Sequence, residues 1–189
     1  EGAIGPLLSM KYCEGGAFNW PTASGFYFNW KLSAKGVLLD RGAHVLDLIC
    51  WWLGEKPRLF SSQNDSFGGC EAVAKVRFQY HQCVGEVFLS WLYPLQNRYV
   101  ITGELGQIEG GIWDWRNVTV TSKSGKQRHI PLKTAQTSVF DFGNLIIANF
   151  LGILSKGEKP LISGSDVIAS IEWIEECYQT ASRFNMPWY

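Results

Sequence analysis

Hydrophobic and polar positions divide the chain into a helical segment, a run of strands and two closing helices. Apolar residues in segment 36–54 recur as in a helix buried on most sides, and Gly54 and Pro57 mark its end. Residues 4–13 predict a strand. Residues 14–35 are rich in Gly, Asn and aromatic side chains, and they predict a long loop with a short strand near residues 26–30.

Between residues 58 and 133 the period becomes that of strands. Apolar and polar residues alternate over residues 72–80, as in a strand buried on one side. Further strands are predicted at residues 84–92, 98–103, 107–113, 117–122 and 127–132, and their short connections indicate an antiparallel sheet. The face that bears Ala72, Ala74, Val76 and Phe78 can pack on helices or on another subunit, and the pattern leaves both open.

Helical spacing returns over residues 138–155, and a last helix begins near Ser163, where Asp166 completes a capping-box pattern. The chain is therefore expected to form one α+β domain over residues 1–189, a predominantly antiparallel β-sheet with helices packed on one face. Glu1 is followed closely by apolar residues, which suggests a chain cut at a domain boundary.

Composition narrows the function classes. The chain has 189 residues, 46% hydrophobic content and a formal net charge of zero, so no basic face points to nucleic acid. Its apolar runs are too short or too interrupted to span a bilayer, and no signal-peptide pattern opens it. Five dispersed cysteines form no C-x-x-C pair, which argues against a metal site and favours reduced thiols in a cytoplasmic protein.

The predicted helix at residues 36–54 carries the candidate chemistry. Asp40, His44 and Asp47 are spaced by four and three residues and so share one side of an otherwise apolar helix. One interpretation is structural: Asp40 favours the helix start, and Asp47 satisfies a buried His44. The other is that His44 exchanges a proton near neutral pH while Asp40 orients it.

Several segments resemble the glucose–fructose oxidoreductase/inositol dehydrogenase (Gfo/Idh/MocA) family. Asp40, His44 and Asp47 match the family's D-x-x-x-H-x-x-D helix after a glycine turn. Residues 99–108 resemble its strand–turn–strand segment, and residues 149–151, 157–160 and 164–166 resemble its closing helix, loop and final helix start. The resemblance extends over nearly the whole chain in the right order.

This resemblance implies the C-terminal domain of an NAD(P)-dependent oxidoreductase that acts on a sugar, polyol or related hydroxy compound. No G-x-G-x-x-G turn is present, so the N-terminal dinucleotide-binding (Rossmann) domain is expected to be absent from this chain. NAD or NADP would be bound mainly by that domain, and the chain alone is expected to bind no cofactor and to be inactive. A small-molecule substrate and a homo-oligomer formed through the sheet face are the expected partners.

The resemblance also implies roles for individual residues. His44 would transfer the hydroxyl proton, Asp40 would hold His44 or the substrate, Asp47 would be a structural partner, and Gly42 would lie close to the nicotinamide. The expected substrate-lining residues are Asn29, Trp30, Lys31, Trp91, Tyr93 and Arg98, although packing explains each equally well.

Other charged residues keep two interpretations. Lys35 and Arg41 can indicate an anionic substrate or a solvated surface. The Glu-Lys-Pro tripeptides that contain Lys56 and Lys159 follow predicted helices, and we interpret them as loops rather than as the family's catalytic motif.

The alternative function is a non-catalytic binding or assembly module derived from the same family. The sequence upstream of Glu1 would discriminate the two, because a dinucleotide-binding motif there favours the enzyme.

Overall fold

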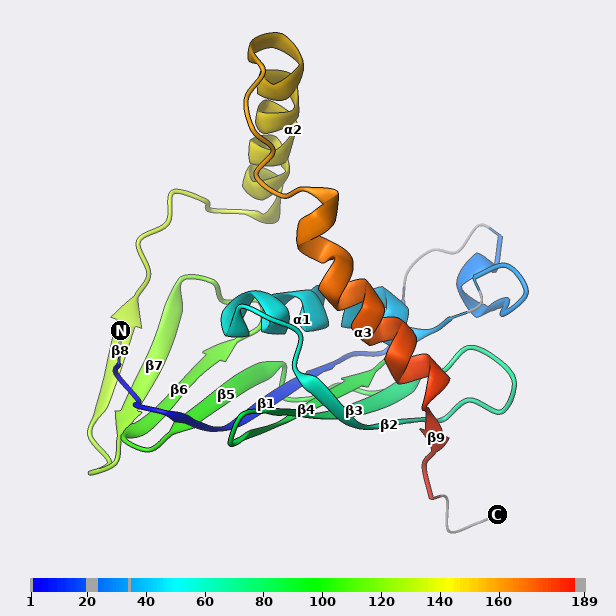
Figure 1. Ribbon diagram of the computed structural model, residues 1–189, viewed down its shortest axis with the longest axis horizontal. Helices are drawn as coiled ribbons and strands as arrows, with labels where there is room; N and C mark the ends of the chain where they lie inside the picture. Colours follow the sequence, from blue (N-terminus) through cyan, green and yellow to red (C-terminus); the bar gives the residue numbers. More distant parts are fainter. Residues whose placement is uncertain (1, 20–23, 34, 186–189) are drawn as a thin grey trace.

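The computed structural model describes residues 2–19, 24–33 and 35–185. A sheet of nine strands forms the base of the molecule, in the order β8-β7-β6-β5-β1-β4-β3-β2-β9 (Figure 1). The strands are β1 (Leu7–Gly15), β2 (Arg58–Asn64), β3 (Val73–Tyr80), β4 (Cys83–Ser90), β5 (Arg98–Gly103), β6 (Gly106–Gly111), β7 (Asn117–Ser122), β8 (Gln127–Pro131) and β9 (Ser182–Arg183). The helical elements are η1 (Phe26–Phe28), α1 (Val37–Leu53), α2 (Val139–Lys156), η2 (Gly164–Val167) and α3 (Ile168–Gln179).

The sheet is mostly antiparallel, as the sequence predicts, and the α+β class is confirmed. The hairpin β3–β4 and the meander β5–β6–β7–β8 are formed by strands adjacent in sequence. Two pairs are parallel: β1 lies beside β4, and β2 lies beside β9. Strand β1 therefore lies between β4 and β5, and the sheet is mixed.

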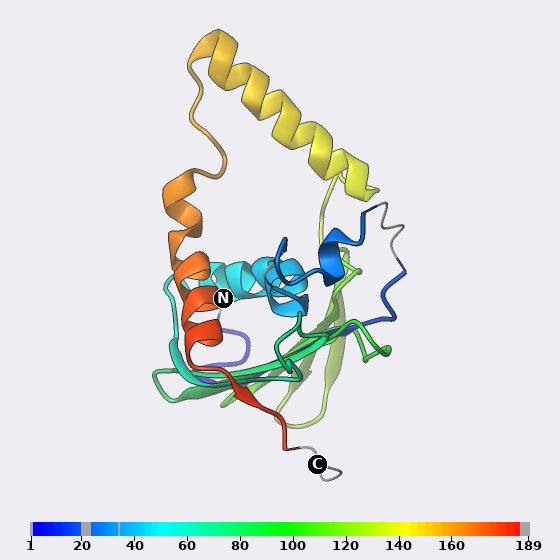
Figure 2. The same ribbon diagram turned by 90° about the vertical axis from the view of Figure 1, so that its right-hand side faces the viewer.

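Helices α1 and α3 cover one face of the sheet and enclose the core (Figures 1 and 2). Ala74, Val76 and Phe78 are buried on this side, and the Phe78 ring meets the Trp173 ring of α3 edge-on with centroids 5.3 Å apart. Burial of such apolar surface is the main favourable term in folding. Of the two alternatives for this apolar strand face, the structure selects packing on helices.

Glu71, in the β2–β3 connection, holds the start of α1. Its carboxylate accepts hydrogen bonds from the backbone N–H of Gly36 and of Leu38, each at 3.0 Å. Its own carbonyl oxygen accepts from the N–H of Val37 at 2.9 Å, and the Tyr178 hydroxyl of α3 donates to the carboxylate at 2.6 Å. A long-range residue thus satisfies the free amides of α1, a role usually taken by a side chain at the helix start.

Helix α1 ends where the sequence predicts. Gly54 adopts a left-handed conformation with φ of 79°, and its N–H donates to the carbonyl of Cys50 at 2.8 Å. Glycine takes this conformation without steric cost, which is why it commonly follows the last helical turn.

Helix α2 departs from the expectation that all helices pack on the sheet. It stands away from the sheet and from α1 (Figures 1 and 2). Large apolar side chains along it are exposed, namely Phe140, Ile146, Ile147, Phe150, Leu151 and Leu154. Helical spacing correctly predicted the helix, but it cannot say what covers an apolar side. Within the described ranges, no helix has the length and apolarity needed to cross a membrane.

The loop before α1 also differs from expectation. Residues Phe26–Phe28 form a short 3₁₀ helix, η1, rather than a strand, because Gly25 turns the backbone with φ of 65° and the chain closes on itself. The first strand, β1, reaches Gly15 and so includes Glu14, beyond the predicted end at residue 13. Trp20, another aromatic residue of this loop, lies outside the described residues.

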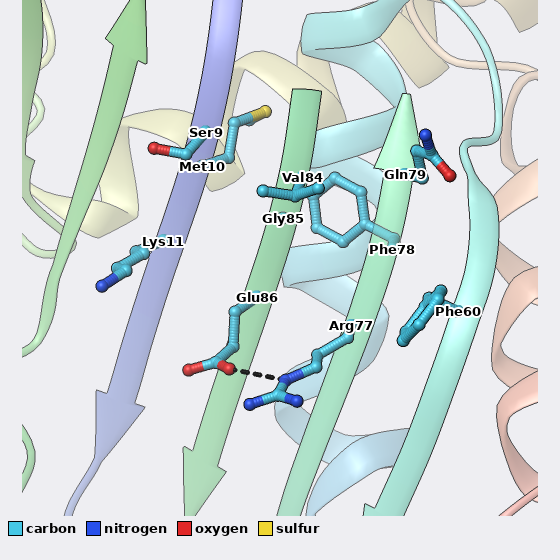
Figure 3. Close-up of a pocket in the computed structure, with 10 residues that line it drawn as sticks. All are labelled: Ser9, Met10, Lys11, Phe60, Arg77, Phe78, Gln79, Val84, Gly85 and Glu86. Atoms are coloured by element: carbon cyan, nitrogen blue, oxygen red, sulfur yellow. Dashed lines mark hydrogen bonds and ion pairs between the residues drawn. The ribbon is translucent and has the colours of Figure 1, made fainter. Parts of the chain in front are cut away.

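The face of the sheet opposite α1 and α3 carries charged side chains around a small apolar hollow of about 330 Å³. Exposed Phe60 and Val84 line it, and the absence of a side chain at Gly85 leaves room for the Phe78 ring (Figure 3). Beside it, Glu86 accepts from Arg77 Nε at 3.0 Å and pairs with Lys75 Nζ at 2.9 Å. We refer to this surface as the open face.

Replacement of Gly36 tests the Glu71 contact. A Cβ atom on Gly36 would overlap the backbone of Glu71, so Gly36→Ala must displace the α1 start from the residue that caps it. We expect the free energy of unfolding to fall by about 1–3 kcal/mol or more, the range for overpacking in a closed site. Urea denaturation measures it. Gly69→Ala, in the β2–β3 connection that carries Glu71, meets no atom within 4 Å and should be near neutral, so equal effects of both changes would contradict this role.

Candidate functional site

Asp40, His44 and Asp47 of α1 each have different surroundings. Asp40 is half-buried, and its Oδ2 accepts a hydrogen bond from Trp91 Nε1 at 3.1 Å. His44, one turn later, is exposed. Within the described part of the chain, no hydrogen bond joins Asp40 to His44, so Trp91 and not His44 holds Asp40 in this structure.

Asp47 faces α3 rather than His44. Its Oδ1 accepts a hydrogen bond from the Ser170 hydroxyl at 2.9 Å, which ties the middle of α1 to α3. His44 and Asp47 both line a groove of about 750 Å³ between α1 and residues 161–169. The remaining lining residues are Leu48, Cys50, Trp51, Gly54, Glu55, Leu161, Ile162, Asp166, Val167 and Ala169. An exposed imidazole at the edge of such a groove can exchange protons with a bound molecule.

Beneath α1, strand β1 supplies a buried carboxylate that the sequence analysis missed. Glu14 is 7% exposed, accepts a hydrogen bond from the Tyr12 hydroxyl at 3.3 Å, and lies 4.0 Å from Arg41 Nη1. Burial raises the pKa of Glu14, and the charges of Arg41 and His44 and the Tyr12 hydrogen bond oppose that rise. The pKa of Tyr12 is raised in turn by its burial and by the Glu14 charge.

Aromatic rings enclose the Asp40 side of the site. The Trp91 indole is 3% exposed, and the rings of Phe18 and Phe28 meet it edge-on with centroids at 5.2 and 6.2 Å. Tyr27 lies 6.4 Å from the same ring. These contacts fix the indole whose N–H donates to Asp40, so the aromatic residues of the loop position an acidic side chain of α1.

The loop residues expected to line a substrate lie on the outer side of that aromatic cluster. Asn29 ends η1, and its Oδ1 accepts from the N–H of Lys31 at 3.1 Å. Trp30 is 53% exposed, with the Lys31 ammonium 6.0 Å from its ring centroid. Tyr93 follows β4 and is 42% exposed. The exposed rings of Trp30 and Tyr93 are free to stack on a ligand, whereas the Asn29 side chain serves a local turn.

Arg98 and Gly42 lie away from this constellation. Arg98 pairs in register with Cys13, so its side chain leaves the sheet on the open face, where it lies 4.0 Å from Glu109. Successive strand residues point to opposite faces, and Glu14 therefore faces α1 while Arg98 does not. Gly42 is buried, and a Cβ atom there would lie 2.8 Å from Leu38 and 3.3 Å from Leu89. The structure thus places Gly42 at the packing contact of α1 with the sheet.

The basic residues that kept two interpretations find partners within the fold. Lys35 lies 3.5 Å from the Glu175 carboxylate and places its ammonium 3.6 Å from the Tyr178 ring centroid. Lys56, in the first Glu-Lys-Pro tripeptide, donates to Glu176 at 2.9 Å. Both lysines anchor α3, and Arg41 is half-buried against Glu14 rather than fully solvated on the surface.

The starts of α1, α2 and η2 do not fit the pyrophosphate of a dinucleotide. Such a group is bound by free backbone N–H groups at a helix N-terminus. Glu71 occupies those of α1, Asp141 caps α2 from within a capping box, and Asp166 does the same for η2. Each start already holds a carboxylate. Among the described residues, no group of three or more His, Cys, Asp or Glu is arranged to hold a metal ion.

A weak signal for Glu14 exists in the sequence. Met10, Tyr12 and Glu14 follow one another at a spacing of two, so Glu14 lies in phase with the core-facing positions of β1. The predicted strand ended one residue earlier and hid this phase. Glu71 has no comparable signal, because it lies in a loop and acts on a helix more than thirty residues away in sequence.

Comparison with known proteins identifies the family. A model of the GFO/IDH/MocA C-terminal domain matches residues 1–109, which is more than half of the chain. No curated protein sequence is significantly similar to the chain.

Solved structures share the fold. KijD10, a 3-ketoreductase from Actinomadura kijaniata determined with NADP and TDP-benzene, has a TM-score of 0.79 at 15% identity, over 98% of this chain and 57% of that one. Aldose-aldose oxidoreductase from Caulobacter crescentus, complexed with glycerol, has a TM-score of 0.72 at 19% identity, over 95% and 54%. Levoglucosan dehydrogenase with NADH and levoglucosan has a TM-score of 0.71 at 16% identity, over 95% and 58%. The chain thus spans little more than half the length of each.

The raised pKa of Glu14 predicts a pH trend in stability. The Glu14 carboxyl has a pKa of 4.5 in the unfolded chain and a higher pKa in the folded protein, so the folded protein binds its proton more tightly. The free energy of unfolding should therefore fall as the pH rises from about 4 through the raised pKa. Glu14→Gln has no such proton. The unfolding free energy of the variant minus that of the wild type should therefore increase over this range, as measured by urea denaturation at a series of pH values.

Glu86 on the open face is the matched control. Burial alone would raise its pKa, but hydrogen bonds and charges from Lys75 and Arg77 outweigh burial and lower it. Its contribution to stability is present above pH 4.5 and is lost as the pH falls through the lowered pKa, so Glu86→Gln should give the opposite trend. A flat difference for Glu14→Gln would mean that its carboxyl is not perturbed.

Proposed function

This chain belongs to the GFO/IDH/MocA family through its C-terminal domain, and on that premise we propose that it is the substrate-binding half of an NAD(P)-dependent oxidoreductase. The proposed substrate is a sugar, a polyol or a related hydroxy compound. The carrying observation is that the family match coincides with an exposed imidazole, His44, at the edge of a groove of about 750 Å³. The structurally similar proteins are described as a ketoreductase, an aldose oxidoreductase and a levoglucosan dehydrogenase, which supports this substrate class.

In this proposal His44 is the proton-transfer residue. A nicotinamide cofactor supplies the hydride chemistry, and the residues of this chain manage the proton of the substrate hydroxyl. His44 accepts that proton when the substrate is oxidised and returns it when the substrate is reduced. Asp40 is held by Trp91 at 3.1 Å and so offers a fixed carboxylate beside His44 for a second substrate hydroxyl. The exposed Trp30 and Tyr93 rings would contact the apolar face of a sugar.

The cofactor would be held by a dinucleotide-binding domain outside residues 1–189. Two observations support this division. The helix starts of this chain are capped by its own carboxylates, and α2 carries a long exposed apolar surface of the kind that marks a contact with another folded unit. We further propose that the open face forms a homo-oligomer interface, in which the hollow lined by Phe60 and Val84 and the charges around Glu86 meet a second copy.

Replacement of His44 tests the catalytic role. In the full-length enzyme, after screening of sugars and polyols with NAD and NADP identifies a substrate, His44→Gln should lower turnover by about 10²–10⁴-fold, the usual contribution of a general base. His44 is exposed, so circular dichroism should show an unchanged fold. His81→Gln in the β3–β4 turn is the matched control and should keep normal turnover. Near-normal turnover of His44→Gln would remove His44 from the mechanism.

Cofactor binding tests the division between domains. Titration of residues 1–189 with NADH or NADPH in a calorimeter should give no heat of specific binding, because Glu71, Asp141 and Asp166 occupy the helix starts that a pyrophosphate would need. The full-length enzyme should bind one of the two. Micromolar affinity of the isolated chain would overturn the assignment of the cofactor to another domain.

A further inference from the structure

Trp91 is a buried residue whose single polar side-chain atom contacts the candidate site. The indole is 3% exposed, and its Nε1 donates a hydrogen bond to Asp40 Oδ2 at 3.1 Å. Burial by itself does not produce such a bond, because Trp173 of α3 is buried too and, within the described ranges, its Nε1 has no hydrogen-bond partner. The bond to Asp40 therefore reflects the place and direction that the fold gives to the Trp91 ring.

The Trp91 ring is fixed from two directions. Its backbone N–H donates to the carbonyl of Ala72 at 2.8 Å, and its own carbonyl accepts from the N–H of Phe18 at 2.7 Å. The rings of Phe18, Tyr27 and Phe28 lie around the indole with centroids at 5.2, 6.4 and 6.2 Å. The indole cannot turn without displacing these rings, so its N–H keeps one direction.

This fixed N–H limits how the Asp40 carboxylate can turn. A carboxylate accepts hydrogen bonds at both of its oxygens, and Oδ2 of Asp40 is taken by the indole. The other oxygen, Oδ1, then has a defined direction in which to accept from a ligand. Asp40 and His44 are four residues apart on α1 and so are neighbours on one side of the helix. A ligand hydroxyl at Asp40 and another at His44 would lie close together, as on adjacent carbons of a sugar.

On the basis of the proposed function, we propose that Trp91 is a positioning residue that makes the enzyme specific for a vicinal diol. Its indole N–H holds Asp40 so that Oδ1 accepts a hydrogen bond from the hydroxyl next to the one that reacts at His44. A site built to bind a hydroxyl discriminates against an analogue that lacks it, because the polar group of the site is then left unpaired. The aromatic rings of the loop contribute through Trp91, on which they pack.

Trp91→Phe tests this role because it keeps an aromatic ring and removes the N–H. The full-length enzyme is used with the substrate that screening of sugars and polyols identifies. KM should rise about 10-fold while kcat changes less than about 2-fold, because a non-reacting hydroxyl is bound in the ground state and in the transition state alike. Against the deoxy analogue that lacks the neighbouring hydroxyl, the variant should be no worse than the wild type. Steady-state kinetics measures both.

A double-mutant cycle separates positioning from a general loss of structure. If Trp91 acts through Asp40, Trp91→Phe should raise KM no further in the Asp40→Asn background. Trp173→Phe is the matched control, since it alters a buried indole that meets Phe78 edge-on, and it should leave KM unchanged. Additive effects in the cycle would overturn the proposal, and so would an equal rise of KM in Trp173→Phe.

Phe28→Leu covers the case in which Trp91→Phe does not fold. The Phe28 ring is 54% exposed and lies 6.2 Å from the indole, so its removal loosens Trp91 without opening the core. KM should rise by about 2–3-fold, the size of one lost ring contact, and should not rise in the Asp40→Asn background. An unchanged KM, or the same rise in that background, would contradict the proposal.

An NMR measurement on residues 1–189 needs neither cofactor nor substrate. The indole N–H signal of Trp91 should move in Asp40→Asn, while the Trp173 signal stays in place. A Trp91 signal that does not move would mean that the bond is absent in solution, and the proposal would fail. An unchanged KM in Trp91→Phe beside an inactive His44→Gln would refute the positioning role and leave the oxidoreductase function standing. Normal turnover of His44→Gln would instead refute the proposed mechanism, whatever the indole signal shows.

Discussion

The contact between Glu71 and the start of α1 is the interaction on which the rest of the structure depends. One residue of the β2–β3 connection satisfies backbone amides of Gly36, Val37 and Leu38 and also receives the Tyr178 hydroxyl of α3. If these buried amides had no hydrogen-bond partners, the folded protein would be destabilised by the full cost of removing them from water. The contact therefore sets where α1 begins, how it lies over the sheet, and that α3 lies beside it. Gly36 is needed because no side chain fits against the Glu71 backbone.

With its start fixed, α1 presents different residues to different neighbours. Gly42 lies at the contact with the sheet, Arg41 reaches Glu14 on β1, Asp47 meets Ser170 on α3, and His44 remains exposed at the groove. A helix places residues three and four apart on one side, yet neighbouring positions on that side can still have different partners. Residues that pack the helix and a residue that can take part in chemistry thus follow one another along α1. Its orientation is held by hydrogen bonds with Glu71, Trp91 and Ser170, which lie in three different parts of the chain.

The molecule also has surfaces that its own core does not use. Helix α2 exposes a row of large apolar side chains, and the open face combines an apolar hollow with the Lys75–Glu86–Arg77 charges. Large contiguous apolar surface is uncommon on an isolated domain and marks contact with another unit. Both surfaces fit a chain that spans little more than half of the structures it matches. They lie on different sides of the sheet, so the two proposed contacts do not exclude each other (Figures 1 and 2).

The sequence by itself determined the local features: helix α1 with its Gly54 end, strands β5 and β7 to the residue, the capping box at Ser163, the α+β class and the family. These follow from spacing and from residues a few positions apart, which a single sequence displays. The tertiary structure alone decided that β1 lies between β4 and β5, that α2 stands away from α1 and the sheet, and that Arg98 leaves the sheet on the open face. It also decided that Glu71 caps α1 and that Glu14 of β1 meets Arg41 of α1. Such contacts join residues far apart in the chain, and their energies depend on burial, which no local pattern records.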